Sequence, residues 1–313
     1  MGYKLAGYEM VGNCEIDPDM NKIYRTNHHP KHSYLMDVRD FKAIPDDQLP
    51  PELFNLDILD GSPPCSVFSM AGQRESGWDK DKVFREGQKH QRLDDLFFEF
   101  IGVAEKLKPR VIIAENVKGL ITGSAKGYVN EIIKHFRTAG YTVQLFLLNA
   151  AQMGVPQARE RVFFVCHRND LDLPKLELNF NESPIPFGQV RSQYGIPFTG
   201  DAAVTVELLK HRRPGDKCLA DISKRIRGRD SGYTNAIMSD NRVATTIASG
   251  ASHYRMYDGL KLSNEDYRNV QTFPQDYDFG DQSVKYVCGM SVPPVMMANI
   301  AAEVFDQWLN RLE

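Results

Sequence analysis

The chain has 313 residues, of which 42% are hydrophobic and 25% charged, as is ordinary for a soluble globular protein, and its formal net charge of -3 excludes a protein-wide basic surface. It has no run of about 18 apolar residues and no N-terminal signal peptide, so we expect no membrane span and a cytoplasmic location. Its five cysteines are odd in number and widely scattered, which argues against a disulfide framework and against a zinc site built from CxxC pairs.

From the N-terminus to about residue 165, strand-like and helix-like patterns alternate along the chain. The predicted strands are residues 10–15, 53–59, 111–114, 141–148 and 161–166, and the predicted helices are residues 19–27, 93–107 and 129–139. Alternation of this kind favours an α/β fold, with a parallel-rich sheet and helices on both of its faces.

The pattern changes after residue 167. Residues 168–242 are rich in Pro, Gly, Arg and Asp, and we expect them to form a second, loop-rich domain. Between residues 210 and 229, eight Lys or Arg stand against two acids, which is typical either of a solvated face or of a phosphate-binding surface. Regular structure returns in residues 243–313, which end in an amphipathic helix over residues 296–312 that follows two prolines.

A cysteine braced by prolines follows the predicted strand 53–59. The sequence Pro63-Pro64-Cys65 places a thiol at the carboxyl end of that strand, where doubly wound sheets bind their ligands. Such a thiol could be a nucleophile held in fixed geometry. Taken alone, the pattern is equally consistent with a turn that carries a buried cysteine.

Other polar residues follow or precede predicted strands. Glu115 comes directly after strand 111–114, so its carboxylate would lie at the same sheet edge as Cys65, unless it is a helix cap or a solvated acid. Arg159 and Arg161, at a spacing of two, would point to one face of an extended segment and could pair with a carboxylate or contact a substrate oxygen. The turn at residues 289–294 opens the last helix, whose N-terminus is a candidate ligand contact.

Taken in order, these segments resemble the cytosine carbon-5 DNA methyltransferase family of bacterial and phage type, over nearly the whole chain. The resemblance implies a Rossmann-like, S-adenosylmethionine-dependent methyltransferase fold with a doubly wound mixed sheet. It assigns residues 1–167 and 243–313 to the catalytic domain and residues 168–242 to a smaller target recognition domain. The matching segments are residues 14–18, 36–38, 63–65, 115–117, 157–161, 262–274 and 289–294.

The resemblance implies methyl transfer from S-adenosylmethionine to carbon 5 of a cytosine that is flipped out of double-stranded DNA, in a restriction-modification or phage protective context. Cys65 would add to carbon 6 as a thiolate. Glu115 would contact ring nitrogen 3 and the exocyclic amine, Arg159 would contact the carbonyl oxygen, and Arg161 would orient Glu115. No metal and no membrane would be needed, and the complete protein would be a monomer.

Cofactor and DNA contacts are implied in the same way. Glu15 would bind the ribose hydroxyls and Asp37 the adenine amine. Residues 66–92 would form a lid over the flipped base. Of the other implied cofactor-binding residues, Ile16, Val38 and Leu96 would pack around the adenine, and Ser291 and Val292 would border the methionine end. Pro64 is a further implied cofactor contact, and the implied DNA-binding residues are Ser69, Arg74, Arg212, Arg213, Arg225, Arg227, Arg229 and Thr246.

The chain departs from the family pattern at its start. Residues 1–8 resemble the helix that follows the family's first strand and its Phe-x-Gly-x-Gly-Gly loop, and that strand and loop are not in this sequence. Either the start is shortened or another chain supplies the segment, and we expect an unpaired sheet edge and weak S-adenosylmethionine binding by residues 1–313. Two alternatives stay open: a non-catalytic DNA-binding remnant of the family, and a tRNA cytosine-5 methyltransferase.

Overall fold

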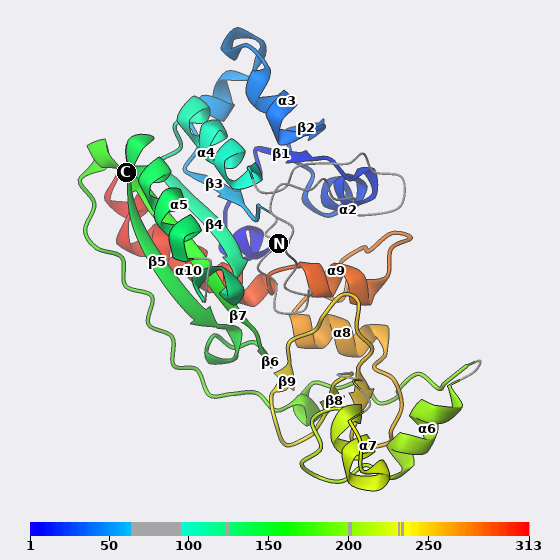
Figure 1. Ribbon diagram of the computed structural model, residues 1–313. Coiled ribbons are helices and arrows are strands. Elements are labelled where there is room, and N and C mark those ends of the chain that lie inside the picture. The colour runs from blue at the N-terminus through cyan, green and yellow to red at the C-terminus, as the bar shows by residue number, and fades with distance from the viewer. Residues whose placement is uncertain (64–94, 123–125, 200–201, 231, 233–234, 313) are drawn as a thin grey trace. The chain divides into compact units, whose positions relative to one another are not determined.

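The computed structural model describes residues 1–63, 95–122, 126–199, 202–230, 232 and 235–312 (Figure 1). The chain divides into two compact units. Unit 1 comprises Met1–Tyr8, Asn149–Arg159 and Asn179–Ala302, and unit 2 comprises Glu9–Leu148, Glu160–Leu178 and Glu303–Glu313. Most of the predicted recognition domain, residues 168–242, therefore falls in unit 1 together with residues 243–302.

Unit 2 contains, in its described residues, a four-stranded sheet and a separate parallel pair of strands (Figure 1). In the larger sheet β3 is parallel to β4, and β4 is antiparallel to β7. The predicted α/β class with a mixed sheet is confirmed. The order of the larger sheet is β3 (Ile58–Gly61), β4 (Val111–Val117), β7 (Glu160–Arg168) and β5 (Tyr141–Asn149), and the parallel pair is β1 (Gly12–Glu15) with β2 (His32–Leu35).

The core of unit 2 forms where helices α4 (Leu96–Leu107) and α5 (Lys126–Thr138) pack on the larger sheet. The rings of Phe97, Phe136 and Phe164 lie with centroids 5.4–6.2 Å apart, in the range that aromatic pairs prefer. The first four residues of β4 are entirely buried, which agrees with their continuous apolar run. Two further helices, α2 (Pro18–His28) and α3 (Val38–Ala43), accompany β1 and β2 (Figure 1).

Two predicted strands differ from the observed ones. Residues 53–59 were expected to form one strand, but Pro51–Phe54 form a 3-10 helix and β3 begins only at Ile58. Pro51 starts this turn because a proline suits the first helical position, and Leu53 is buried in the turn instead of in the sheet. The strand predicted at residues 111–114 continues to Val117, because β7 pairs with β4 along its whole length.

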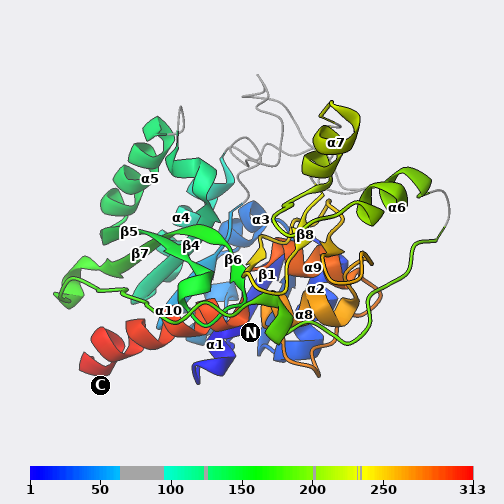
Figure 2. The same ribbon diagram turned by 90° about the horizontal axis from the view of Figure 1, so that it is seen from below.

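Unit 1 is built from short elements (Figure 2). The region expected to be loop-rich contains two helices, α6 (Ala203–Lys210) and α7 (Leu219–Arg227), whose leucines and Ile222 pack around Tyr254. The helix predicted at 296–312 is α10 (Pro294–Gln307), which begins in unit 1 and ends in unit 2. The remaining elements are α1 (Gly2–Leu5), β6 (Gln157–Ala158) paired with β9 (Ala244–Thr245), β8 (Ile237–Met238) paired with β10 (Tyr254–Arg255), α8 (Asn264–Gln271) and α9 (Val284–Met290).

One stretch of the described chain, Val284–Arg311, is long and apolar enough to cross a membrane by length and composition alone. It is not one continuous helix, since α9 ends at Met290 and α10 begins at Pro294. Half of an apolar 18-residue window within it is also buried in the protein, as in the core helix of a globular domain.

His253 is a buried titratable group of unit 1, with 2% of its surface exposed. Its Nδ1 lies 3.3 Å from the Tyr267 hydroxyl, and its Nε2 accepts a hydrogen bond from the backbone N–H of Ala248. Burial, together with the positive charge of Lys285, lowers the pKa of His253 from 6.5 to about 4. The folded protein therefore keeps this imidazole neutral at pH values where the unfolded chain takes up a proton.

We expect His253 to make the free energy of unfolding fall as the pH drops from 6.5 towards 4, by up to about 3 kcal/mol, because protons bind preferentially to the unfolded chain. Urea unfolding at pH 7 and pH 4.5 measures this loss. His253→Asn should flatten the difference, whereas His29→Asn, at an exposed left-handed position that suits Asn, should leave it unchanged. Equal pH dependence in all three proteins would contradict the assignment.

Candidate active site

Glu115 and Arg161 form an ion pair across strands β4 and β7. In the antiparallel register Glu115 lies opposite Phe163 and Val117 lies opposite Arg161, so the two charged residues are diagonal neighbours on one face. Arg161 Nε lies 2.9 Å from Glu115 Oε1, and the side chains are 14% and 15% exposed. Burial lowers the pKa of Arg161, and the Glu115 carboxylate opposes that shift. The sheet therefore holds this carboxylate in one orientation.

Asn116, the next residue of β4, connects the strand to the chain segment that leads to Pro64 and Cys65. Its side-chain amide donates to the carbonyl oxygen of Pro63 at 3.0 Å and accepts from the backbone N–H of Val117 at 2.9 Å. Because Asn116 is 3% exposed, each of these bonds satisfies a buried polar group. The predicted residues Pro64, Cys65, Ser69 and Arg74, and the predicted lid 66–92, lie outside the described residues.

Arg159 belongs to unit 1 and is 2% exposed. Its Nη1 donates to the carbonyl oxygen of Ile247 at 3.1 Å and its Nη2 to that of Gly289 at 2.9 Å. The expectation that Arg159 and Arg161 extend from one continuous extended segment is wrong. The backbone N–H of Arg159 donates to the carbonyl oxygen of Gln157, so the chain turns between β6 and β7, and the two arginines bond within different units.

Two buried glutamines of unit 1, which the sequence did not single out as site residues, join several of the motifs. Gln157 Nε2 donates to Gln271 Oε1 at 2.6 Å, and Gln157 Oε1 accepts from the backbone N–H of Ile247 at 3.1 Å. Gln271 Nε2 then donates to the carbonyl oxygen of Ser291 at 2.7 Å. Thr246, expected at the DNA, donates from its hydroxyl to the carbonyl oxygen of Ala158 at 2.8 Å. The only sequence signal for this contact was that the motifs at residues 157–161 and 262–274 each contain a glutamine.

The end of α9 is packed closely against a neighbouring segment. An added Cβ at Gly289 would lie 2.4 Å from the backbone nitrogen of Ser249, so only glycine fits at this position. Ser291 donates from its hydroxyl to the carbonyl oxygen of Val287, and Val292 is half-buried. Both residues predicted for the methionine end of the cofactor therefore lie in unit 1, whereas the residues predicted for its adenosine half lie in unit 2.

Two carboxylates lie at the carboxyl ends of the parallel strands β1 and β2. Glu15 is the last residue of β1 and pairs with Leu35, and Asp37 follows two residues after Leu35. Glu15 accepts from the backbone N–H of Asp17 at 2.9 Å, and burial raises the pKa of its carboxyl group. Asp37 accepts from the backbone N–H of Arg39 at 2.8 Å as the N-cap of α3. This strand edge is where α/β sheets bind ligands.

The apolar residues predicted around the adenine differ in burial. Ile16, next to Glu15, is 41% exposed and offers an open apolar surface. Val38 packs against the cluster that contains Phe41, and Leu96 is a buried residue at the first position of α4. Of the three, Ile16 is therefore the side chain most accessible to a ligand.

The basic residues predicted to bind DNA fall into two groups. The Arg212 guanidinium donates to the backbone carbonyl oxygens of Leu209, Met256 and Tyr257 at 2.6–3.0 Å. Arg225 pairs with Asp216 and donates to a backbone carbonyl oxygen. These two residues hold the fold of unit 1 together. The other three, Arg213, Arg227 and Arg229, are exposed.

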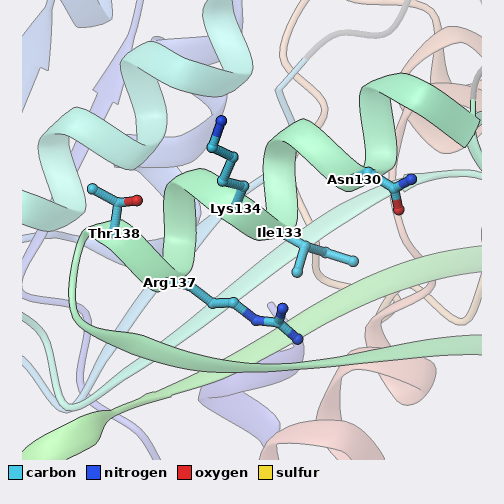
Figure 3. Close-up of a pocket in the computed structure, with 5 residues that line it drawn as sticks. All are labelled: Asn130, Ile133, Lys134, Arg137 and Thr138. Atoms are coloured by element: carbon cyan, nitrogen blue, oxygen red, sulfur yellow. The ribbon is translucent and has the colours of Figure 1, made fainter.

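A surface groove of about 540 Å³ runs along α5 (Figure 3). Its lining contains none of the sequence-predicted site residues, because all of its side chains come from this one helix. Within the described ranges, no group of three or more His, Cys, Asp or Glu residues could hold a metal ion. The groove lining consists of Asn130, Ile133, Lys134, Arg137 and Thr138.

The mixed four-stranded sheet, together with the separate parallel pair that is followed by Glu15 and Asp37, fits a Rossmann-like methyltransferase fold, and solved structures agree. A protein described as a DNA modification methyltransferase encoded within an E. coli prophage aligns with a TM-score of 0.69 and 18% identity, covering 99% of this chain and 95% of that one. A variant of Spodoptera frugiperda DNMT2 aligns with a TM-score of 0.62 and 16% identity, covering 97% and 95% of the two chains.

Sequence comparison resolves the family within this fold. Residues 1–306 match the family described as C-5 cytosine-specific DNA methylase. Type II methyltransferase M.FnuDI of Fusobacterium nucleatum is 31% identical over 346 residues, covering 100% of this chain and 92% of the relative. Type II methyltransferase M1.HphI of Haemophilus parahaemolyticus is 26% identical over 331 residues, covering 99% and 84%. This chain belongs to the C-5 cytosine-specific DNA methylase family, as the order of its motifs predicted.

The contact between Asn116 and Pro63 should be important for stability. Asn116→Ala leaves the buried carbonyl oxygen of Pro63 without its donor, so we expect the free energy of unfolding to fall by about 1–3 kcal/mol. Lys118→Ala is the matched control, because Lys118 directly follows β4 and its ion pair with Glu160 is largely exposed, where such a pair contributes less than about 1 kcal/mol. Urea unfolding measures both, and equal losses would show that the Asn116 contact is dispensable.

Proposed function

We propose that this protein is a DNA (cytosine-5-)-methyltransferase that acts through a covalent Cys65 adduct, in a restriction-modification or phage protective setting in the cytoplasm. Membership of the C-5 cytosine-specific DNA methylase family supports the reaction class. The proposal rests mainly on the position of the Glu115 carboxylate, which Arg161 fixes by an ion pair. The next residue of the same strand, Asn116, bonds to Pro63 in the segment that leads to Cys65.

In the proposed reaction the Cys65 thiolate adds to carbon 6 of the flipped cytosine, and the electrons of the 5,6 double bond make carbon 5 nucleophilic. Glu115, oriented by Arg161, contacts ring nitrogen 3 and the exocyclic amine and so stabilises the charge that develops on the ring. Arg159 contacts the carbonyl oxygen. After methyl transfer, water removes the carbon-5 proton and the bond from sulfur to carbon 6 breaks, which restores the thiolate and the double bond.

S-adenosylmethionine, when bound, supplies an electrophilic methyl group. The acceptors at the ends of β1 and β2 fit its adenosine half, because ribose hydroxyls and an exocyclic amine are hydrogen-bond donors. In this proposal Glu15 binds the ribose, Asp37 binds the amine, and the other residues border the adenine or the methionine. Those other residues are Ile16, Val38, Pro64, Leu96, Ser291 and Val292.

Residues 168–242 are proposed as the target recognition domain for double-stranded DNA, with residues 1–167 and 243–313 as the catalytic domain of a monomer that needs no metal. Recognition of DNA would draw on the exposed cations of this region together with Thr246. Arg212 and Arg225 would then support binding indirectly, because their guanidinium groups already bond within unit 1.

The two groups of arginines make a test of the DNA-binding surface. In the double variant Arg227→Ala with Arg229→Ala, we expect weaker DNA binding and a salt-dependence slope reduced by about 2, one unit for each lost phosphate contact. Arg212→Ala should instead lower the melting temperature, because it removes three hydrogen bonds to backbone carbonyls. Titrations of labelled duplex DNA at several salt concentrations measure the slope. An unchanged slope in the double variant would refute the proposal that this surface binds DNA.

The nucleophile is tested by covalent trapping on duplex DNA that contains 5-fluorocytosine, since fluorine at carbon 5 cannot leave as a proton does. With S-adenosylmethionine present, so that carbon 5 is methylated and retains the fluorine, we expect the wild-type protein to form an adduct that survives denaturation, and Cys65→Ser to form none. Cys218→Ser is the matched control, because Cys218 is the N-cap of α7 and serine is a good residue there. An adduct that persists in Cys65→Ser, or that disappears in Cys218→Ser, would be inconsistent with the mechanism.

A further inference from the structure

Arg39 of α3 holds the Asp37 carboxylate from two directions. Its backbone N–H donates to Asp37 Oδ1 at 2.8 Å, and its guanidinium Nη1 lies 3.2 Å from Oδ2 and 3.4 Å from Oδ1. The N-cap bond fixes the position of the carboxylate at the end of the helix, and the guanidinium fixes its rotation. Arg39 therefore fixes both the position and the rotation of the Asp37 carboxylate.

The same guanidinium reaches a second element. Arg39 Nη2 pairs with Asp95, the residue directly before Leu96 at the start of α4. Arg39 therefore connects the carboxylate proposed for the adenine amine with the helix that supplies a proposed adenine contact. All three residues lie in unit 2, at the end of the parallel pair where Glu15 also lies.

Asp37 can still accept from a ligand. An ionised carboxylate has about four acceptor sites on its two oxygens, and the contacts with Arg39 use only part of that capacity. The Asp37 side chain is 18% exposed, so a donor from outside the fold can approach it. A carboxylate accepts hydrogen bonds and donates none when ionised, so it favours an amino group over a carbonyl group at the same place.

We infer that Arg39 is a positioning residue for nucleobase selection: by fixing Asp37, it makes the cofactor site prefer a 6-aminopurine to a 6-oxopurine. This inference rests on the proposed function, in which Asp37 faces the adenine amine. The 6-oxopurine presents an oxygen where adenine presents an N–H, and a fixed carboxylate next to that oxygen is repelled. A carboxylate that can rotate away is repelled less by the oxygen, so it distinguishes the 6-aminopurine from the 6-oxopurine less strongly.

A merely structural role for Arg39 can be separated from this one. Lys42 lies three residues further along α3, on the same face, and pairs with Glu99 of α4. Arg39 and Lys42 are thus successive members of one ladder of ion pairs between α3 and α4. Lys42→Ala removes a comparable pair from this ladder while the contacts between Arg39 and Asp37 remain.

The experiment measures the dissociation constants of S-adenosylhomocysteine and S-inosylhomocysteine by calorimetry, in wild-type protein, Arg39→Ala, Arg39→Lys and Lys42→Ala. The ratio of the two constants does not depend on how tightly the rest of the ligand is held. We expect wild-type protein and Lys42→Ala to prefer the adenosyl compound by about tenfold or more, and Arg39→Ala to lose most of that preference. Arg39→Lys should lie between them, because an ammonium group cannot bridge both carboxylates in a planar fork.

A preference that is unchanged in Arg39→Ala, or lost equally in Lys42→Ala, would overturn the inference and leave the proposed function standing, provided that the wild-type protein methylates DNA. A wild-type protein that binds neither compound at millimolar concentration would overturn the proposed function and this inference together. Urea unfolding of each variant shows whether Arg39→Ala and Lys42→Ala lose similar stability, as members of one ladder should.

Discussion

The antiparallel pairing of β4 with β7 is the constraint on which the candidate active site depends. Val111 to Val117 pair in register with His167 to Arg161, and this register makes Glu115 and Arg161 diagonal neighbours. Successive residues of a strand point to opposite faces, so Glu115 and Asn116 serve different partners from adjacent positions. A slip of one residue would exchange the two faces and separate the carboxylate from its arginine. The first four residues of β4, which are apolar and buried, hold that register.

In unit 1, buried polar side chains fix the positions of the predicted site residues, as the strand register does in unit 2. Gln157, Gln271 and Arg159 are almost completely enclosed, so each must find partners or cost free energy. Gln157 and Gln271 bond each other, and the three side chains also bond the backbone carbonyl and amide groups of Ile247, Gly289 and Ser291. Hydrogen bonds therefore join motifs that are far apart in the sequence.

The sequence alone predicted most of the strands and helices in residues 9–168, because apolar runs and amphipathic spacing are local signals, but it missed the short elements β2 and α3. It could not separate the 3-10 turn at Pro51–Phe54 from a strand, since both bury Leu53, and it missed the short helices α6 and α7. The family motifs indicated that Glu115 and Arg161 would meet. The structural use of Arg212 and the contact between Gln157 and Gln271 depend on partners many residues away, which no local pattern reveals.

The central claim is that this chain methylates carbon 5 of cytosine in duplex DNA. The most direct test incubates the protein with duplex DNA and S-adenosylmethionine that carries a labelled methyl group, digests the DNA to nucleosides, and identifies the labelled product by mass spectrometry. The account predicts that the label appears as 5-methyl-2′-deoxycytidine. Label on an exocyclic amine of cytosine or adenine, or no labelled nucleoside at all, would contradict it.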